Sequence, residues 1–323
     1  MYSIRRIFNP EIYQGKYKSR NYFEGWYYKI IDKSSQNIFA IIPGVSITKE
    51  GKHAFIQFIN ANTGLTKYLN YKIDDFHYSE RELEISINNN HFNKLGLTLD
   101  FSSEDISVYG NVNFTNIVPF PKSILNPGIM GPYSFIPFME CHHGIVNMHC
   151  ELDGYITFNG NKLDFTGGYG YIEKDWGSSF PQSWIWLQSN HFDEYNASVM
   201  FSIASIPWFH RHFDGLISFL RIDDKVFRFA TYTGAKIKKL TFDNDRLCVS
   251  IEDSKFILNL EVTISKGGTL KAPKKGKMDI EITETITSIV KVALTEKTGK
   301  KIFDGLGRNT GLELAGDFRK FLR

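Results

Sequence analysis

The segment Gly170–Gln188, GYIEKDWGSSFPQSWIWLQ, places two carboxyl groups among aromatic side chains. Side chains alternate between the two faces of a β-strand, so Tyr171, Glu173 and Asp175 share one face if this segment is a strand. If that face lines a cavity, both carboxyl groups project into an aromatic environment. Burial disfavours the charged form of a carboxyl group, so such a group keeps its proton and can act as an acid near neutral pH.

A second strand-like run follows. Alternation gives one of its faces four side chains suited to an apolar ligand with a polar end: Trp184, Trp186, Gln188 and Asn190. We expect the two tryptophans to form a cavity wall together with Trp26 or Trp176. The alternative is that they belong to an ordinary core, which on composition alone is the commoner fate of tryptophan.

Two further runs combine ionisable groups with aromatic ones. FEGWYY contributes Glu24 as a third candidate acid and Trp26 as a further wall residue, and MECHHG contributes His142 and His143, expected to polarise a phenol. Adjacent residues of a strand point to opposite faces, so these two histidines cannot jointly bind one metal without a bend. The spacing of His142, His149 and a carboxylate is not diagnostic of a metal site, and we predict no metal and no cofactor.

Each carboxylate has a structural alternative. Glu173 or Asp175 could form an ion pair with a nearby Lys or Arg and contribute only to stability. Glu284 lies on an apolar strand face and is a weaker cavity candidate, with a bulge or a strand break as its alternative. The chain carries no Gly-rich phosphate loop, nucleophile elbow or dinucleotide fingerprint.

The surrounding sequence is patterned as antiparallel β-structure. Residues 280–295 alternate apolar and polar side chains, as do residues 255–264 and 225–232, and Asp153-Gly154, Asn159-Gly160 and Asp243-Asn244 are typical of turns. No amphipathic helix longer than a few turns is evident. The fold class predicted is all-β, and the strands suffice for two barrels of about eight strands, each able to enclose a small ligand. The proline-rich stretch Pro119–Pro137 is predicted to be an excursion, either a lid or a crossover.

Composition limits the function classes. The chain has 323 residues, 15% of them aromatic, and a net charge of +3 with both signs interspersed, so nucleic-acid binding lacks a basic face. The basic run KAPKKGK at 271–277 is interpreted as a solvated loop, with contact to phosphate or a membrane surface as the alternative. Three cysteines without a CxxC pair indicate a reducing compartment. The N-terminal residues lack the apolar region of a signal peptide and no run is long enough for a membrane helix, so we expect a cytoplasmic protein, with peripheral membrane contact allowed.

Several of these runs together resemble the signature segments of the tocopherol cyclase family. They are FEGWYYK, PGIMGPYSFIPFMECHHG, GGYGYIEKDWGSSFPQSWIWLQSNHF, RFATYTGA and the closing GLELAG, and they span residues 21–316. The family is similar to the lipocalin-like carotenoid hydratases, so the resemblance implies two tandem lipocalin-like antiparallel β-barrels. We expect the first barrel over residues 1–165 and the second over 166–323, with the boundary near 150–170.

The resemblance also implies an activity: acid-promoted cyclisation, or hydration, of a prenylated quinol or similar hydrophobic isoprenoid, as in an intramolecular lyase (isomerase). Its chemistry protonates an alkene, holds the tertiary cation against aromatic faces and presents a phenol oxygen to it. Asp175 is our first candidate for the acid, because it adjoins Trp176 and Gly177, where a strand end can open toward a ligand. Glu173 is then its orienting partner. The alternatives are a non-catalytic isoprenoid carrier and an interaction module whose lumen is filled with side chains.

Overall fold

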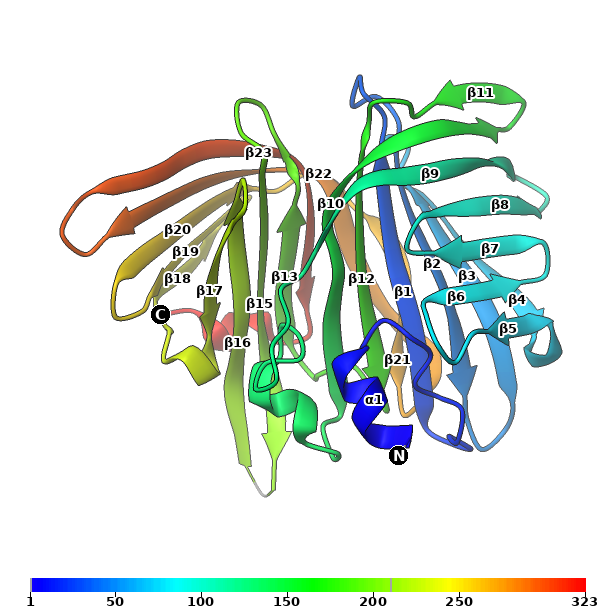
Figure 1. Cartoon of the computed structure of the whole chain (residues 1–323), viewed down its shortest axis with the longest axis horizontal. Helices are drawn as coiled ribbons and strands as arrows, with labels where there is room; N and C mark the ends of the chain where they lie inside the picture. Colours follow the sequence, from blue (N-terminus) through cyan, green and yellow to red (C-terminus); the bar gives the residue numbers. More distant parts are fainter. Residues whose placement is uncertain (1, 210) are drawn as a thin grey trace. The chain divides into compact units, whose positions relative to one another are not determined.

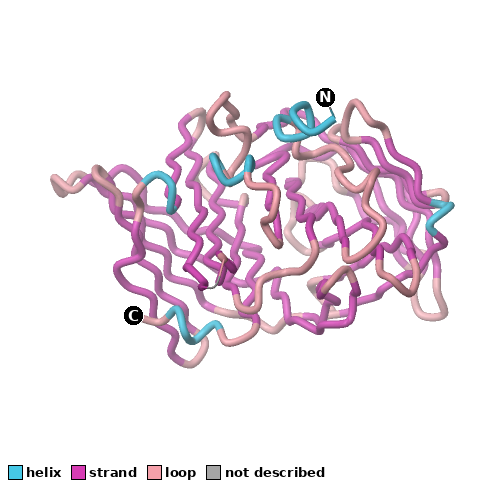
Figure 2. Tube along the Cα trace, turned by 90° about the horizontal axis from the view of Figure 1, so that it is seen from below, coloured by secondary structure: helices cyan, strands magenta, loops and turns pink. Residues whose placement is uncertain are grey.

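A computed structural model describes residues 2–209 and 211–323 of the chain. It is built almost wholly of strands and the loops that join them (Figure 2). Helical structure is limited to short pieces: α1 (Tyr2–Phe8) and the 3-10 turns η1 (Ile73–Asp75), η2 (Gly131–Phe135), η3 (Thr231–Thr233) and η4 (Phe318–Phe321). In the described chain, no helix has the length and apolar character needed to cross a membrane.

The chain divides into two compact units, residues 1–180 with 270–281, and residues 181–269 with 282–323. The first unit contains a 12-stranded antiparallel sheet in the order β4-β3-β2-β1-β12-β10-β9-β8-β7-β6-β5, with β11 paired to β10 (Figure 1). Its strands are β1 (Tyr22–Ile31), β2 (Ile38–Ile47), β3 (Lys52–Asn60), β4 (Leu65–Lys72), β5 (Phe76–Tyr78), β6 (Glu84–Ile87), β7 (Asn90–Asn93), β8 (Gly96–Ser102), β9 (Ser107–Pro119), β10 (Cys141–Phe158), β11 (Asn161–Asp164) and β12 (Tyr169–Gly177).

The first sheet curls into a nearly closed barrel. Its edge strands β4 and β5 are consecutive in the chain and joined by η1, and β3 lies against both η1 and β6. One apolar core fills the inside, to which β1 contributes Trp26 and Tyr28 and β12 contributes Ile172. Closing the sheet in this way leaves little of its edges exposed.

The second sheet has eleven strands, in the order β17-β16-β15-β13-β23-β22-β20-β19-β18, with β14 paired to β23 and β21 to β22. Its strands are β13 (Trp184–Ser189), β14 (His191–Phe192), β15 (Ala197–Trp208), β16 (Arg211–Ile222), β17 (Lys225–Ala230), β18 (Lys236–Asp243), β19 (Arg246–Glu252), β20 (Phe256–Thr263), β21 (Gly268–Lys274), β22 (Lys277–Glu296) and β23 (Lys301–Ala315). It curves around a core of its own, to which the edge strands β17 and β18 contribute Phe229 and Leu240. The prediction of an all-β chain with two antiparallel barrel-like parts is confirmed.

Two local predictions are wrong. Asp153-Gly154 is not a turn but lies inside β10, where a Cβ on Gly154 would come within 2.3 Å of the Asn111 carbonyl oxygen on β9. The glycine thus allows the two strands to approach closely. The basic run at 271–277 is not a solvated loop either. It forms the hairpin between β21 and β22, and Gln57 of β3 holds it by hydrogen bonds to the backbone N–H and carbonyl of Lys271.

The excursion after β9 is as predicted. Residues 120–140 lie outside the sheet, with η2 in their midst, and the chain returns to the sheet at Cys141, where β10 begins. Ile129 and Met130 anchor this excursion by burial.

Candidate functional site

The central strand β12 carries the predicted acids. It lies between β1 and β10, and Asp175 pairs across the ladder with Gly25 on one side and His143 on the other. Tyr171, Glu173 and Asp175 share one face, as alternation predicts. That face points away from the apolar core of the first unit, because Ile172 of the opposite face belongs to that core. The cavity considered for these two carboxyl groups is therefore not the interior of this barrel, and their projection into a ligand cavity remains a prediction.

His143 bridges the two carboxylates. Its Nδ1 lies 2.8 Å from Asp175 Oδ1, and its Nε2 lies 3.6 Å from Glu173 Oε2. The Tyr171 hydroxyl donates a hydrogen bond of 2.6 Å to the same Glu173 oxygen. Burial and the neighbouring Glu173 raise the pKa of Tyr171 well above its ordinary value, so the phenol keeps its proton and remains a donor. We call these four groups of β12 and β10 the relay: hydrogen bonds join Tyr171 to Glu173 and His143 to Asp175, and a 3.6 Å approach separates the His143 and Glu173 atoms.

The groups of this relay differ in access to solvent. The Asp175 side chain is 24% exposed, the His143 side chain 12% and the Glu173 side chain 5%. Asp175 is therefore the more accessible of the two carboxyl groups, and Glu173 is the more buried.

Two sulfur atoms, those of Met130 and Cys141, lie next to the relay. The sequence analysis did not predict that either would be there. The backbone N–H of His143 donates to Met130 Sδ at 3.1 Å, which ties the excursion to the site. Cys141 Sγ lies 3.9 Å from Asp175 Oδ1. Burial, together with Asp175 and Glu140, raises the pKa of Cys141 well above its ordinary value, so the thiol is not a nucleophile.

The same three side chains could hold a metal ion. One ligand atom from each of His143, Glu173 and Asp175 lies within 4.8 Å of the others, and imidazole with carboxylates suits a divalent transition metal. An imidazole hydrogen-bonded to one carboxylate, with a second carboxylate oxygen 3.6 Å from its other nitrogen, is equally the arrangement of a proton relay. The two uses differ in their response to a chelator.

His142 faces the other way from His143. Its ring stacks on Trp176 with centroids 5.2 Å apart and an interplanar angle of 10°, on the core side of the sheet. Burial, with the nearby cations Lys18 and Lys174, lowers the pKa of His142 to about 4. His142 is therefore neutral near pH 7, and it lies on the opposite face of the sheet from the relay.

Glu24 lies on the core side as well, in a buried ion pair with Lys174. The Tyr22 hydroxyl donates to Glu24 Oε2 at 2.5 Å, and the backbone N–H of Gln14 lies 2.8 and 3.0 Å from the two carboxylate oxygens. The carboxylate is thus fully engaged by donors. This arrangement favours a structural role for Glu24.

The Lys174 ammonium has partners from three parts of the chain. It donates hydrogen bonds of 2.8 and 2.5 Å to the carbonyl oxygens of Pro10 and Ile12, and it lies 4.7 and 4.8 Å from the ring centroids of Trp26 and Trp176. Burial lowers the pKa of Lys174 to about 8, although Glu24 opposes the shift. Lys174 was missed as a partner of Glu24, since only the register of β1 against β12 brings the two together.

The second unit carries the remaining predicted ligand contacts. Trp184 and Trp186 share one face of β13, while Ile185 and Leu187 of the other face belong to the core of that unit. The Trp184 indole N–H donates to Glu313 Oε2 at 2.5 Å.

The polar end of this face comprises Gln188 of β13 and Asn190, which follows the end of that strand. Gln188 Nε2 donates to Asn190 Oδ1 at 3.2 Å. Glu284 is buried and pairs across the ladder with Glu313, which sequence reasoning missed within the GLELAG run. The expected wall that these tryptophans share with Trp26 or Trp176 remains a prediction.

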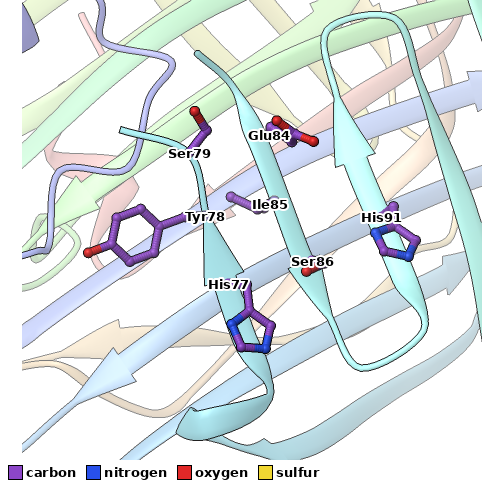
Figure 3. A pocket seen from close by; sticks show the side chains of 7 residues that line it. All are labelled: His77, Tyr78, Ser79, Glu84, Ile85, Ser86 and His91. Atoms are coloured by element: carbon purple, nitrogen blue, oxygen red, sulfur yellow. The ribbon is translucent and has the colours of Figure 1, made fainter. Parts of the chain in front are cut away.

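A separate depression lies on β5, β6 and β7 of the first unit (Figure 3). Its volume is about 320 Å³, and it is lined by His77, Tyr78, Ser79, Glu84, Ile85, Ser86 and His91. The lining is mostly polar and much of it is exposed. Such a surface does not suit the apolar ligand that the sequence predicts.

Comparison with known proteins identifies the family. The sequence model described as tocopherol cyclase-like matches residues 112–316. The chain belongs to the tocopherol cyclase-like family. His143, Glu173 and Asp175 lie within the matched range, as do Trp184 and Trp186, whereas Glu24 and Trp26 precede it.

Two curated relatives of this family member come from plants. The chain is 25% identical over 194 residues to the tocopherol cyclase, chloroplastic, of Zea mays, and 25% identical over 192 residues to "Probable tocopherol cyclase, chloroplastic" of Oryza sativa subsp. japonica. Each alignment covers 56% of this chain but only 40% of the relative's own length.

Solved structures share the fold at low sequence identity. CghA in complex with Sch210972 aligns with a TM-score of 0.56 and 10% identity, over 92% of this chain and 89% of that chain. Kievitone hydratase from Nectria haematococca aligns with a TM-score of 0.51 and 12% identity, over 94% of both chains. At such identities the likeness concerns the fold alone.

Proposed function

We propose that this chain catalyses proton-driven cyclisation or hydration of a prenylated quinol or a similar hydrophobic isoprenoid. Family membership supports the reaction class, since the curated relatives are named tocopherol cyclases. The observation that carries the proposal is the His143 imidazole held between Glu173 and Asp175. A general acid must carry a proton and must be reprotonated after each turnover. An imidazole between two carboxylates can deliver a proton to the carboxyl group that acts as the acid.

In the proposed reaction, Asp175 gives its proton to the less substituted carbon of a trisubstituted alkene. The π electrons form the new C–H bond, and a tertiary cation remains on the neighbouring carbon. For cyclisation, the phenol oxygen of the quinol attacks this cation and its proton returns to Asp175, so that product and substrate are isomers. For hydration, a water oxygen attacks the cation instead, the protonated alcohol that forms returns one proton to Asp175, and the product gains one water.

The remaining relay groups have supporting roles. His143 passes the proton to and from Asp175, Glu173 orients the imidazole, and Tyr171 fixes Glu173 by its hydrogen bond. Tyr27, the cross-strand partner of Glu173, adds an aromatic ring to the same face. A tertiary cation near such rings gains about 1–2 kcal/mol from each when water is excluded.

The test is turnover in deuterated water. The purified protein is incubated with a prenylated hydroquinone, and the products are separated and weighed by mass spectrometry. A cyclised product carries one deuterium at the former alkene carbon, and a hydrated one also carries the mass of water. Asp175→Asn keeps the shape but deletes the acid, and we expect turnover to fall by about 10²–10⁴-fold, the usual contribution of general acid catalysis.

The matched control is Asp153→Asn, which makes the same change at an exposed position of β10 and should leave turnover unchanged. Full activity of Asp175→Asn would remove Asp175 from the mechanism. Loss of wild-type activity with EDTA would replace the relay by a metal at His143, Glu173 and Asp175. Tight binding of the quinol without any turnover would mean that the protein is a carrier.

A further inference from the structure

The excursion of the first unit contains an exposed tight turn, residues 123–126, with an unusual composition. The backbone N–H of Ser123 donates to the Asn126 carbonyl at 2.8 Å, and the N–H of Asn126 donates to the Ser123 carbonyl at 3.1 Å. Ile124 and Leu125 occupy the two positions between them, and they are 81% and 73% exposed. Gly, Asn, Asp and Pro dominate such positions, so two large apolar side chains at a tip break the local rule.

More apolar surface belongs to the same excursion. Phe138 is 59% exposed and Phe135 is exposed as well. Scattered single apolar side chains on a surface are ordinary, but several on one short segment indicate a surface that meets an apolar partner.

The residues on both sides of the exposed turn are held by contacts with other parts of the first unit. Lys122 Nζ donates to Glu11 Oε2 at 2.7 Å and lies 3.4 Å from the Phe8 carbonyl oxygen. The Phe135 ring packs edge-on against the Phe8 ring, with centroids 6.0 Å apart. Farther along, Met130 is tied to the backbone of His143, so the excursion connects the outward turn with the candidate site.

A basic loop precedes β1, at the same end of the strands where the excursion enters β10. Residues 16–20, Lys-Tyr-Lys-Ser-Arg, are all exposed, and Tyr17 among them is 70% exposed. This loop leads into β1, and the excursion leads into β10. The register places the first residues of these two strands at the same end of the sheet, because Phe23 of β1 and Cys141 of β10 both pair with Gly177.

The basic loop and the apolar turn thus belong to the two segments that enter β1 and β10 at the same end of these strands. Lys16 has Glu80 as a partner, whereas Lys18 extends over the ring of Tyr22 and is close enough to lower the pKa of His142. A basic loop with an exposed tyrosine, together with an exposed apolar turn, supplies the side-chain types that suit the zone between lipid headgroups and acyl chains.

We propose that this edge of the first unit docks onto an anionic lipid bilayer. Ile124 and Leu125 enter the acyl region, Tyr17 lies at the headgroup level, and Lys16, Lys18 and Arg20 contact anionic headgroups. The docking does not depend on the proposed reaction, and it would give the candidate site access to ligands dissolved in the bilayer.

The test is sedimentation of the full chain with vesicles of phosphatidylcholine, with and without phosphatidylglycerol. The wild type should sediment with the anionic vesicles, and added salt should weaken this binding. Ile124→Ser/Leu125→Ser should lower the partition coefficient by roughly tenfold or more, because two apolar side chains no longer enter the acyl region. Replacing Lys16, Lys18 and Arg20 by Gln should abolish the preference for phosphatidylglycerol.

The matched control is Ile289→Ser/Leu306→Ser, which removes one exposed Ile and one exposed Leu from strands of the second unit. It should bind vesicles like the wild type. Equal binding by the two double variants, or no binding by the wild type, would overturn the proposal. A change of oligomeric state in Ile124→Ser/Leu125→Ser, without a change in vesicle binding, would make this surface a contact between copies of the chain. Asp175→Asn should bind vesicles normally, so failure of the reaction leaves the docking proposal intact.

Discussion

Lys174 carries a buried ammonium group whose partners come from distant segments of the chain. Glu24 supplies the counter-charge from β1, and Pro10 and Ile12 supply carbonyl oxygens from the N-terminal segment. Removing one member of a buried pair leaves the other charge without compensation, which costs far more than the net worth of the pair. The lowered pKa of Lys174 reflects the same cost of burial.

We therefore predict that Lys174→Met lowers the free energy of unfolding by about 3–5 kcal/mol. The measurement is denaturant unfolding followed by tryptophan fluorescence. The double variant Glu24→Gln/Lys174→Met removes both charges and keeps an oxygen that can accept from the Gln14 N–H. It should recover most of the loss. If the double variant is as unstable as Lys174→Met alone, the pair is not the source of the effect.

At the residue scale, the sequence predicts which side chains share a strand face, but not which face of the strand packs against the core. Alternation correctly predicts that Tyr171, Glu173 and Asp175 share one face and that His142 and His143 point apart. It cannot tell which face of β12 meets the core, because both faces of the strand are largely buried and both mix apolar with charged residues. Only the distant partners distinguish them: Trp26 pairs with Lys174 on the core side, and His143 pairs with Asp175 on the other.

Among the elements, the end of β12 decides the geometry of the relay. Gly177 pairs with both Phe23 and Cys141, two residues beyond Asp175. A Cβ at Gly177 would lie 2.1 Å from the Glu140 carbonyl oxygen, so β10 and β12 could not keep their present separation at this point. The approach of these two strands positions His143 against Asp175.

We expect Gly177→Ala to cost about 1–3 kcal/mol of stability and to lower turnover of a prenylated quinol by more than its loss of folded protein explains. Gly160→Ala is the control, since its backbone φ is also positive, at +81°, but nothing lies within 4 Å of the added methyl group. Measuring turnover per folded molecule separates the two effects. Equal turnover by the two variants would show that the end of β12 does not control the site.

Element prediction succeeds where local chemistry dominates and fails where a distant strand intervenes. The prolines of the excursion predict its departure from the sheet, because proline cannot donate to a ladder. The dipeptide Asp153-Gly154 is typical of a turn when judged from local sequence alone. It lies within β10 because β9 pairs with it there at close range. Likewise the basic run at 271–277 lacks any local signal that Gln57 of β3 holds its backbone.

At the scale of the whole molecule, the first unit is not continuous in sequence. Residues 270–281 belong to it, although the residues on either side of them belong to the second unit. Ser46 Oγ donates to the Gly276 carbonyl at 2.7 Å, and Met278 packs with Phe23 and Phe55. Such contacts cannot be read from composition, because nothing in the run itself names strands more than two hundred residues away.

This organisation predicts the behaviour of fragments. A fragment of residues 1–165 lacks β12, which bonds to both β1 and β10, so each of those strands would expose unpaired backbone groups and the fragment should not fold. Residues 1–180 restore β12 but still lack the hairpin at 270–281. Residues 1–180 with this hairpin attached through a flexible linker should therefore be the most stable of the three. Circular dichroism during denaturant unfolding gives the comparison. If residues 1–180 are as stable without the hairpin as with it, the contacts of Gln57, Ser46 and Phe55 with residues 270–281 contribute nothing measurable, and the first unit is complete at residue 180.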